Sequence, residues 1–298
     1  MSIEAQSAWT VTVVIPVWNR AGEVGTAIDS VLAQTRAAFE IIVVDDGSTD
    51  DTPNVLARYG DRIRVVRQSN QGVAVARNAG IAIARGDLIA FLDSDDVWLP
   101  HKLERQAARF GADPELGLVH CGAEFTGFGV NLNGMEGWVA DEILRMDRDV
   151  IIAHGSGVII PRRVLEEVGA FDTRMRVSED WDLCYRIARR YRVGFVNEVL
   201  VNYARHETGL HRDIAKMEVG MALALQKAFD DPVAQPLRRH AYGRLHRILS
   251  GCYFEQRQWL AFARHFVKSV MWDWRNVGYF AAYPLRLIRR ALGARPAT

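Results

Sequence analysis

The apolar residues of the first hundred positions fall into short, unbroken runs separated by longer stretches with helical spacing. The runs are Val11 to Ile15, Ile41 to Val44, Ile63 to Val66 and Leu88 to Leu92. Because they lack polar alternation, they are typical of strands buried on both faces. Residues 72–84 have the apolar spacing of a helix, and Gly86 stands where a C-terminal cap is expected. Strands that alternate with helices predict a mostly parallel sheet flanked by helices, in an α/β domain.

The pattern beyond residue 100 is less regular. Phe125 to Gly137 is rich in Gly and Asn, which predicts a mobile loop or an irregular hairpin. Val150 to Ile160 predicts a strand interrupted by a His-Gly-Ser segment, and Glu179 to Arg190 predicts a helix. Residues 236–292 are expected to be wholly helical and include eleven aromatic side chains.

Charge is divided unequally along the chain. The 298 residues include 37 Lys and Arg and 36 Asp and Glu, so the net charge is close to zero. Residues 236–298 nevertheless carry +10, and the remainder carries −9. An acidic part followed by a basic part indicates two tasks. We therefore expect an α/β domain at residues 1–213 and a basic, aromatic helical region at residues 214–298.

The composition, 49% hydrophobic and 24% charged, excludes disordered, fibrous and small disulfide-framed proteins. The longest uncharged run, residues 5–19, has 15 residues, fewer than the roughly 18 apolar residues of a spanning helix. The first residues lack the basic start and apolar core of a signal peptide. Cys121, Cys184 and Cys252 are widely spaced, as reduced structural thiols are. We expect a cytoplasmic protein.

Carboxylates follow two of the predicted strands. Asp45 and Asp46 come after the second strand, and Asp93, Asp95 and Asp96 come after the fourth. Ligands of open α/β sheets bind outside the carboxyl ends of the strands. Converging carboxylates repel one another unless a cation lies among them, and oxygen ligands suit Mg²⁺ or Mn²⁺ bridging to phosphate. The clusters predict a metal-bound diphosphate substrate; the alternative is that they form a turn and a helix cap.

A series of motifs in this order resembles the family 2 glycosyltransferases of the GT-A fold. The motifs of the nucleotide-sugar half, residues 10–100, are Val13 to Asn19, Val43 to Asp50, Ala76 to Gly80 with Gly86-Asp87, and Phe91 to Asp96. Those of the acceptor half, residues 101–213, are Pro161-Arg162-Arg163, Gly169 to Asp172 and Ser178 to Leu183. The resemblance covers about residues 10–210, and it is the succession of motifs that is specific.

The resemblance implies a set of donor-binding residues: Pro16, Trp18, Asp46, Arg77, Asp93, Ser94 and Asp95. Trp18 would stack on the nucleobase, and Asp46 would accept the N3 hydrogen of uracil or thymine. Arg77 would lie near the base or the diphosphate. The residues themselves leave alternatives open: Trp18 as a core aromatic, Arg77 as a solvated helix residue, and Asp96 as the cap of the next helix.

The resemblance also implies the metal ligands and the acceptor side. Asp95 and Asp93 would hold Mn²⁺ or Mg²⁺, with His206 completing the set. Asp180 would be the base that takes the acceptor proton, and Glu179 would support it, although an Asp at a helix start is also a common cap. The expected acceptor-binding residues are His154, Trp181 and Arg205.

These expectations together predict a metal-dependent inverting glycosyltransferase. It would transfer a sugar from a UDP-linked donor to a hydroxyl of a glycan or a lipid-linked acceptor, as in polysaccharide biosynthesis. The alternatives are a nucleotidyltransferase or other sugar-nucleotide enzyme, and a non-catalytic nucleotide-sugar-binding scaffold. No Gly-rich, Lys-containing phosphate loop follows the first strand, which disfavours the nucleotidyltransferase. A dinucleotide-binding dehydrogenase is excluded because no G-x-G-x-x-G follows Val11 to Ile15.

The basic region, residues 236–298, has two interpretations. A basic, aromatic, helical segment is suited to lie in the interface of an anionic membrane, which would bring the enzyme to a lipid-linked acceptor as a peripheral membrane protein. Alternatively, the same aromatic faces pack on the acidic domain or on a second subunit in a homo-oligomer. Neither interpretation involves nucleic acid.

Overall fold

The computed structural model describes residues 9–204 and 213–281, and the chain divides into two compact units. The described residues of Met1–Ile143 and Arg148–Ala224 form the first unit. Those of Leu144–Asp147 and Leu225–Thr298 form the second.

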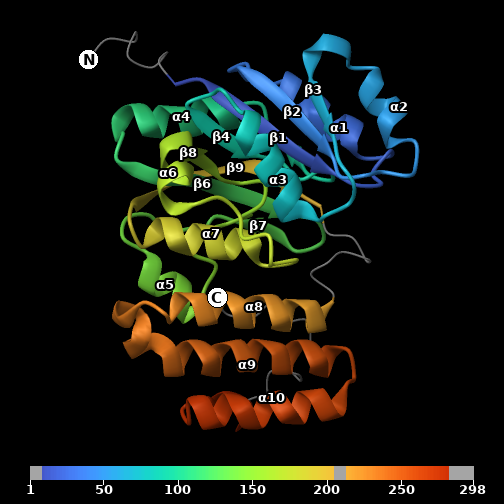
Figure 1. The fold of residues 1–298 in the computed structure, drawn as a ribbon. Coiled ribbons are helices and arrows are strands. Elements are labelled where there is room, and N and C mark those ends of the chain that lie inside the picture. Colours follow the sequence, from blue (N-terminus) through green and yellow to red (C-terminus); the bar gives the residue numbers. More distant parts are fainter. Residues whose placement is uncertain (1–8, 205–212, 282–298) are drawn as a thin grey trace. The chain divides into compact units, whose positions relative to one another are not determined.

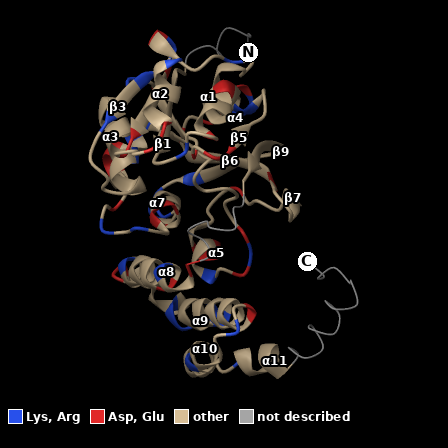
Figure 2. Ribbon diagram, turned by 90° about the vertical axis from the view of Figure 1, so that its right-hand side faces the viewer, with Lys and Arg blue, Asp and Glu red and all other residues tan. Residues whose placement is uncertain are grey.

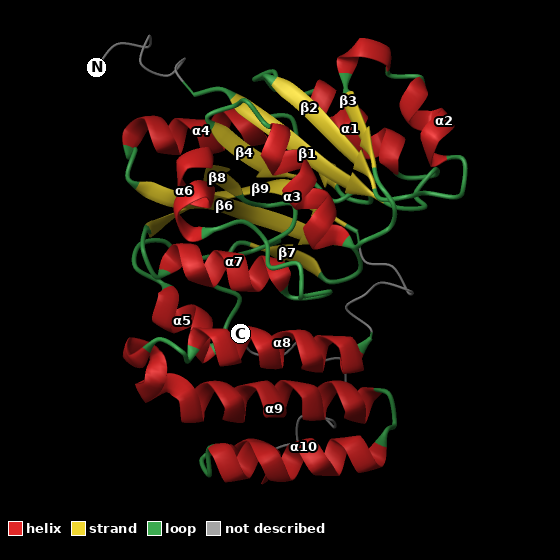
Figure 3. Ribbon diagram, in the orientation of Figure 1, coloured by secondary structure: helices red, strands yellow, loops and turns green. Residues whose placement is uncertain are grey.

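The first unit is built on one sheet, to which the described residues contribute nine strands (Figures 1 and 3). In spatial order these are β3 (Arg64–Arg67), β2 (Glu40–Asp45), β1 (Val11–Val17), β4 (Leu88–Phe91), β8 (Ile159–Pro161), β6 (Leu116–Phe125), β9 (Arg192–Tyr203) and β5 (Val97–Trp98), with β7 (Gly129–Asn131) paired to β6. The first four strands are parallel, and β8 joins β4 and β6 antiparallel. The α/β class is confirmed, with its continuous parallel part confined to β3, β2, β1 and β4.

Helices cover this sheet. The described helices of the first unit are α1 (Val24–Leu32), α2 (Thr52–Ala57), the 3-10 turn η2 (Gly60–Arg62), α3 (Val73–Ile83), α4 (Lys102–Ala112), α6 (Arg162–Val168) and α7 (Glu179–Ala188), while α5 (Ala140–Arg145) and α8 (Ile214–Ala228) extend from the first unit into the second. One buried cluster joins Val13 of β1 to Ile28 of α1 and Phe110 of α4. On the other face of β1, α3 lies so close that a Cβ on Gly80 would be 2.4 Å from Val14. Glycine at position 80 therefore sets the distance between α3 and the sheet.

Several expectations about local structure need correction. The strand near residue 64 is not buried on both faces: Val65 is exposed because β3 is the edge strand. Gly86 is not a left-handed helix cap; a Cβ there would be 2.6 Å from the Thr12 nitrogen, so glycine allows the chain to pass β1 closely. Phe125 to Gly137 contains an irregular hairpin, formed by β6 and β7.

The segment from residue 151 to residue 156 is not a strand either. It forms bends and turns, with Ala153 at φ 49°, and only Ile159–Pro161 pairs in the sheet. The Ser156 and Gly157 nitrogens both donate to the Ala153 carbonyl, which closes a tight turn. This turn brings Gly155 and Ser156 toward the end of β4, as described below.

The second unit is helical where it is described. Its elements are the 3-10 helix η4 (Pro232–Leu237), α9 (Arg238–Glu255), α10 (Trp259–Trp272) and α11 (Asn276–Ala281), together with the end of α8. Residues 256–258 and 273–275 connect these helices, so the expected helical C-terminal region is confirmed over its described residues, and residues 282–292 of the expected range lie outside them. Polar contacts join α9 to α10: the Ser269 hydroxyl donates to the Gly243 carbonyl, and the Nδ1 atoms of His246 and His265 are 3.0 Å apart.

None of the helices within residues 9–204 and 213–281 combines the length and apolar character needed to cross a bilayer.

Candidate active site

The first candidate cluster lies after β2. Asp46 is buried, and its carboxylate accepts hydrogen bonds from the Gln68 side chain and from the nitrogens of Gln71 and Gly72. Asp45 accepts from the Ser48 nitrogen. Both carboxylates therefore fix the loops that follow β2 and β3. The expected contact of Asp46 with a nucleobase stays a prediction.

Trp18 follows β1 directly and is 52% exposed. The alternative of a core aromatic is therefore wrong, and the ring is open to a ligand. The next residue, Asn19, joins the loops after β1 and β2, because its nitrogen donates to the Ser48 hydroxyl and its side-chain oxygen accepts from the Thr49 nitrogen. Pro16 is buried within β1; its role in donor binding stays a prediction.

The second cluster follows β4 at the centre of the sheet. The side chains of Asp93 and Asp95 keep about a quarter of their surface exposed, whereas Ser94 and Asp96 are buried. Asp95 lies 3.9 Å from the Arg20 guanidinium. Asp93 and Asp95 are thus the two carboxylates of this cluster that solvent reaches.

Asp96 has a different role from the helix cap considered above. Its carboxylate accepts from the Ser156 hydroxyl and, at 2.7 Å, from the Ala204 nitrogen. Burial and the nearby Asp93 charge raise the pKa of Asp96 to about 8, against the effect of these two hydrogen bonds. Asp96 therefore ties the end of β9 and the 153–157 turn to the end of β4.

Arg77 links the two halves of the site. It is 2% exposed, and its guanidinium donates to Asp93 at 2.6 Å and to Glu179 at 2.7 Å. Burial alone lowers the pKa of Arg77, but the carboxylates of Asp93, Glu179 and Asp180 outweigh it and raise the pKa above its usual range. Arg77 is not a solvated helix residue. Its expected contact with the donor stays a prediction.

Glu179 and Asp180 begin α7. Asp180 is not the N-cap, which is Ser178, and its carboxylate accepts from the Trp181 nitrogen at 2.7 Å. Glu179 is buried; burial and the Asp180 charge raise its pKa to about 7, while Arg77 opposes the shift. A carboxyl with this pKa exchanges its proton near neutrality, beside the half-buried carboxylate of Asp180.

The acceptor-side residues are partly described. Trp181 is half-buried and stacks on Tyr185, with 5.8 Å between the ring centroids. His154 is half-buried in the 153–157 turn. Arg205 and His206 lie outside the described residues, beyond Ala204, whose nitrogen Asp96 holds.

Comparisons with known proteins decide the family. A family model described as Glycosyl transferase family 2 matches residues 12–169, more than half of the chain. An uncharacterized glycosyltransferase of Nostoc sp. (strain PCC 7120) is 31% identical over 280 residues, which cover 90% of this chain and 85% of that relative. The chain belongs to glycosyltransferase family 2.

A further relative and two solved structures are also similar to the chain. An uncharacterized glycosyltransferase of Rickettsia prowazekii is 31% identical over 207 residues. The match covers 66% of this chain and 64% of that relative, slightly less than two thirds of its length. The mannosyltransferase PcManGT from Pyrobaculum calidifontis, solved with GDP-Man and Mn²⁺, has a TM-score of 0.63 at 22% identity, over 94% of this chain and 82% of its own. Residues 1–349 of S. aureus TarS have a TM-score of 0.62 at 18% sequence identity, and the match covers 88% of this chain and 81% of that one. These likenesses confirm the expected GT-A fold.

In this family 2 chain, the contacts of four residues were not anticipated from sequence. A Cβ on Gly155 would be 2.5 Å from Asp93, so only glycine fits beside that carboxylate. The Ser156 hydroxyl accepts from the Asp93 nitrogen while it donates to Asp96. Asn78 holds Phe171 through two backbone hydrogen bonds. The Gly-Ser pair at 155–156 was visible in the sequence, but its contacts arise from residues about 60 positions away.

Tyr203, at the end of β9, marks how closely the carboxylates gather. Burial raises the pKa of its hydroxyl above the usual range, and the charges of Asp93, Asp96 and Asp180 raise it further. The carboxyl groups that follow β4 and Asp180 at the start of α7 therefore all lie near the Tyr203 hydroxyl.

The donor atoms present fit a divalent cation. Asp93 accepts from Arg77 through Oδ1, and its other carboxylate oxygen, Oδ2, can face a cation. The side chain of Asp95 is partly open to solvent and can also offer an oxygen atom. Mg²⁺ and Mn²⁺ are commonly held by one or two carboxylates together with substrate phosphates. Within the part of the chain that the structure describes, no group of three or more His, Cys, Asp or Glu side chains forms a ready-made metal site.

Proposed function

We propose that this family 2 chain transfers a sugar from a nucleoside diphosphate sugar, UDP-linked by preference, to a hydroxyl of a glycan or lipid-linked acceptor. The observation that carries the proposal is the Arg77 bridge, since it joins Asp93 at the end of β4 to Glu179 at the start of α7. A donor-binding carboxylate and the candidate base pair thereby share one site. Solved structures of similar fold contain GDP-Man with Mn²⁺ and, for TarS, UDP.

Donor recognition would begin with the base. The exposed ring of Trp18 offers a flat apolar face for stacking. Among the described residues, the Oδ1 atom of Asp46 accepts two hydrogen bonds and Oδ2 accepts one, from the Gly72 nitrogen. Because each carboxylate oxygen has two lone pairs, Oδ2 can also accept the N3 hydrogen of a uracil.

The reaction would be a single displacement with inversion. Asp180 takes the proton of the acceptor hydroxyl as its oxygen attacks the anomeric carbon, and the bond from that carbon to the diphosphate breaks. Glu179, held by Arg77, keeps the base oriented. Bound at Asp93 and Asp95, a divalent cation supplies positive charge beside the departing diphosphate. The products are the glycoside and the nucleoside diphosphate.

Isothermal titration calorimetry of UDP and GDP, with Mn²⁺ and with EDTA, tests the donor side. We expect UDP to bind the wild-type protein at least about tenfold more tightly with Mn²⁺, and Asp95→Asn to remove this difference. Asp61→Asn is the matched control, because Asp61 is exposed in η2 and contacts none of the site residues above. UDP affinity unaffected by EDTA would contradict the metal assignment. No binding of either nucleotide would contradict the proposed donor class.

A further inference from the structure

Helix α10 packs on α9 with one face and exposes apolar side chains on the other. The face that packs on α9 includes the buried residues His265 and Ser269. On the opposite face, Leu260 is 90% exposed, Val267 is exposed, and Met271 is 75% exposed. The intervals of seven and four residues place these three side chains in one stripe along the helix. An exposed stripe of large apolar side chains predicts that this side of the helix meets an apolar medium.

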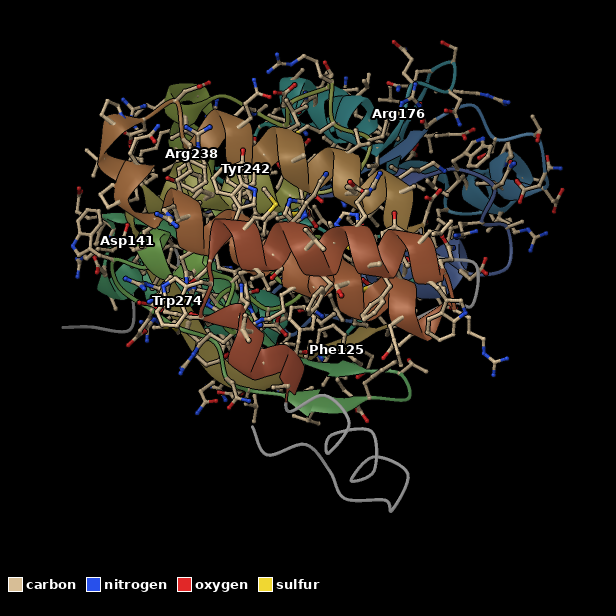
Figure 4. The ribbon with its side chains drawn as sticks, turned by 90° about the horizontal axis from the view of Figure 1, so that it is seen from below. Phe125, Asp141, Arg176, Arg238, Tyr242 and Trp274 are labelled. Atoms are coloured by element: carbon tan, nitrogen blue, oxygen red, sulfur yellow. The ribbon has the colours of Figure 1, made fainter. Side chains whose placement is uncertain are left out.

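Exposed tryptophans lie at or near both ends of α10. Trp259, the first residue of α10, is exposed, and Trp274, two residues beyond its last, is 72% exposed. Figure 4 looks onto α10 from its outer side and labels Trp274 beside its C-terminal end. Tryptophan is the residue type most suited to a boundary that is apolar on one side and wet on the other.

A basic row lies beside the apolar stripe. Arg264 comes four residues after Leu260, and Lys268 comes one residue after Val267. At helical spacing, both basic side chains lie on the same flank of the stripe. α10 contains these two basic residues and no acidic residue (Figure 2). Arg275, next to Trp274, forms a salt bridge with Asp273.

We propose that the outer face of α10 docks on an anionic lipid surface, and we name Leu260, Val267, Met271 and Trp274 the docking stripe. Its apolar side chains would enter the acyl boundary, and the basic row would lie at the level of anionic headgroups. The basic flank favours lipid over a second copy of the chain, because an antiparallel two-fold copy would set its own basic row against this one, whereas anionic headgroups would neutralise it. The inference is independent of the sugar transferred.

Co-sedimentation of the full-length protein with vesicles tests this surface. We expect binding to phosphatidylcholine vesicles that contain phosphatidylglycerol, weaker binding to phosphatidylcholine alone, and loss of binding as salt is raised. Leu260→Ser with Met271→Ser should lower the partition constant by at least about tenfold. Val233→Ser is the matched control, because Val233 is an exposed valine in η4 outside the docking stripe. Urea unfolding would check that the double variant remains folded.

Two further measurements separate the contribution of the basic row from that of the apolar stripe. Lys268→Gln should weaken binding to anionic vesicles and leave binding to neutral ones unchanged. Brominated lipid chains should quench the tryptophan fluorescence of the bound protein, and Trp274→Phe should reduce that quenching. Wild-type protein that stays in the supernatant at low salt would overturn the proposal, as would a double variant that binds as tightly as wild type. A wild-type dimer that the double variant dissociates would assign the stripe to a second copy instead.

Discussion

The two halves of the sheet in the first unit place their polar groups by different means. In the parallel half, Trp18, Asp46 and Asp93 follow directly on β1, β2 and β4, so the strand ends bring them together. In the mixed half, the polar groups come from the 153–157 turn and from the first turn of α7. Hydrogen bonds to the parallel half, through Ser156 and Glu179, hold them in position.

This difference shows which parts of a site depend on local sequence and which depend on the completed fold. Parallel strands have their carboxyl ends at the same edge of the sheet. The residues that follow these strands therefore lie close together without help from the rest of the chain. A turn such as 153–157 acquires its shape only when its partners are present. Substitutions at the join between the halves should therefore have effects that substitutions within either half do not.

Arg77→Met should have the largest effect, because it leaves the buried Glu179 and the partly exposed Asp93 without their cation. We expect the free energy of unfolding to fall by about 3–5 kcal/mol and activity to be lost. Arg77→Lys keeps the charge but lacks the fork that bridges two carboxylates, so it should recover stability more than turnover. Urea unfolding and steady-state kinetics measure both. An Arg77→Met protein as stable as wild type would show that the bridge does not hold the halves together.

Asp180→Asn should separate the halves functionally. We expect turnover to fall by about 10² to 10⁴, the range for loss of a general base, with UDP affinity unchanged. The substitution is nearly isosteric, and the side-chain oxygen can still accept from the Trp181 nitrogen. Kinetics and calorimetry on the same preparation check the two parts. Near-normal turnover would make Asp180 structural, and weaker UDP binding would place it with the donor residues.

Gly155→Ala should disturb the join more mildly. Its new methyl group would meet Asp93 at 2.5 Å and the Arg77 guanidinium at 3.1 Å, so the turn must shift. A displacement of this size lowers turnover by about 10 to 10². Gly111→Ala is the matched control: apart from its chain neighbours and the backbone of its own helix, no described atom lies within 4 Å of the added Cβ, and it should stabilise α4 by about 0.5–1 kcal/mol. Equal turnover in the two variants would mean that the turn adapts freely.

The buried His120 predicts an acid-sensitive step within the mixed half. Its Nε2 donates to the Met135 carbonyl and its Nδ1 accepts from the Ile152 nitrogen, and burial, with nearby His154, lowers its pKa to about 4. The unfolded chain takes up this proton near pH 6.5 and the folded chain only near pH 4. Stability should therefore fall as the pH drops through this window, by about 1–3 kcal/mol.

His120→Gln should flatten that dependence, since glutamine keeps a donor and an acceptor but does not titrate. Urea unfolding from neutral pH to about pH 4.5 compares the two slopes. The variant should be less stable than wild type at neutral pH, because glutamine does not replace the ring that stacks on Phe195. Parallel curves for the two proteins would contradict the assignment of this acid sensitivity to His120.

Sequence predicted the parallel half well for a physical reason. The four strands there were placed within two residues of their observed ends. For β1, β2 and β4 the reason is that buried strands are apolar runs that need no other part of the chain to be recognised. The exposure of β3 was not predicted, since an edge position depends on strand order. The partners of Asp96 were not predicted either, since Ser156 and Ala204 are 60 and 108 residues away.

The two hydrogen bonds between Asn78 and the backbone of Phe171 make a single amide informative about opening of the site. The Phe171 nitrogen donates to the Asn78 side chain, so its proton exchanges with deuterium only when the segment around Phe171 leaves α3. The protection of this one amide, measured without any substrate, thus reports the free energy of opening the contact between α3 and the segment around Phe171.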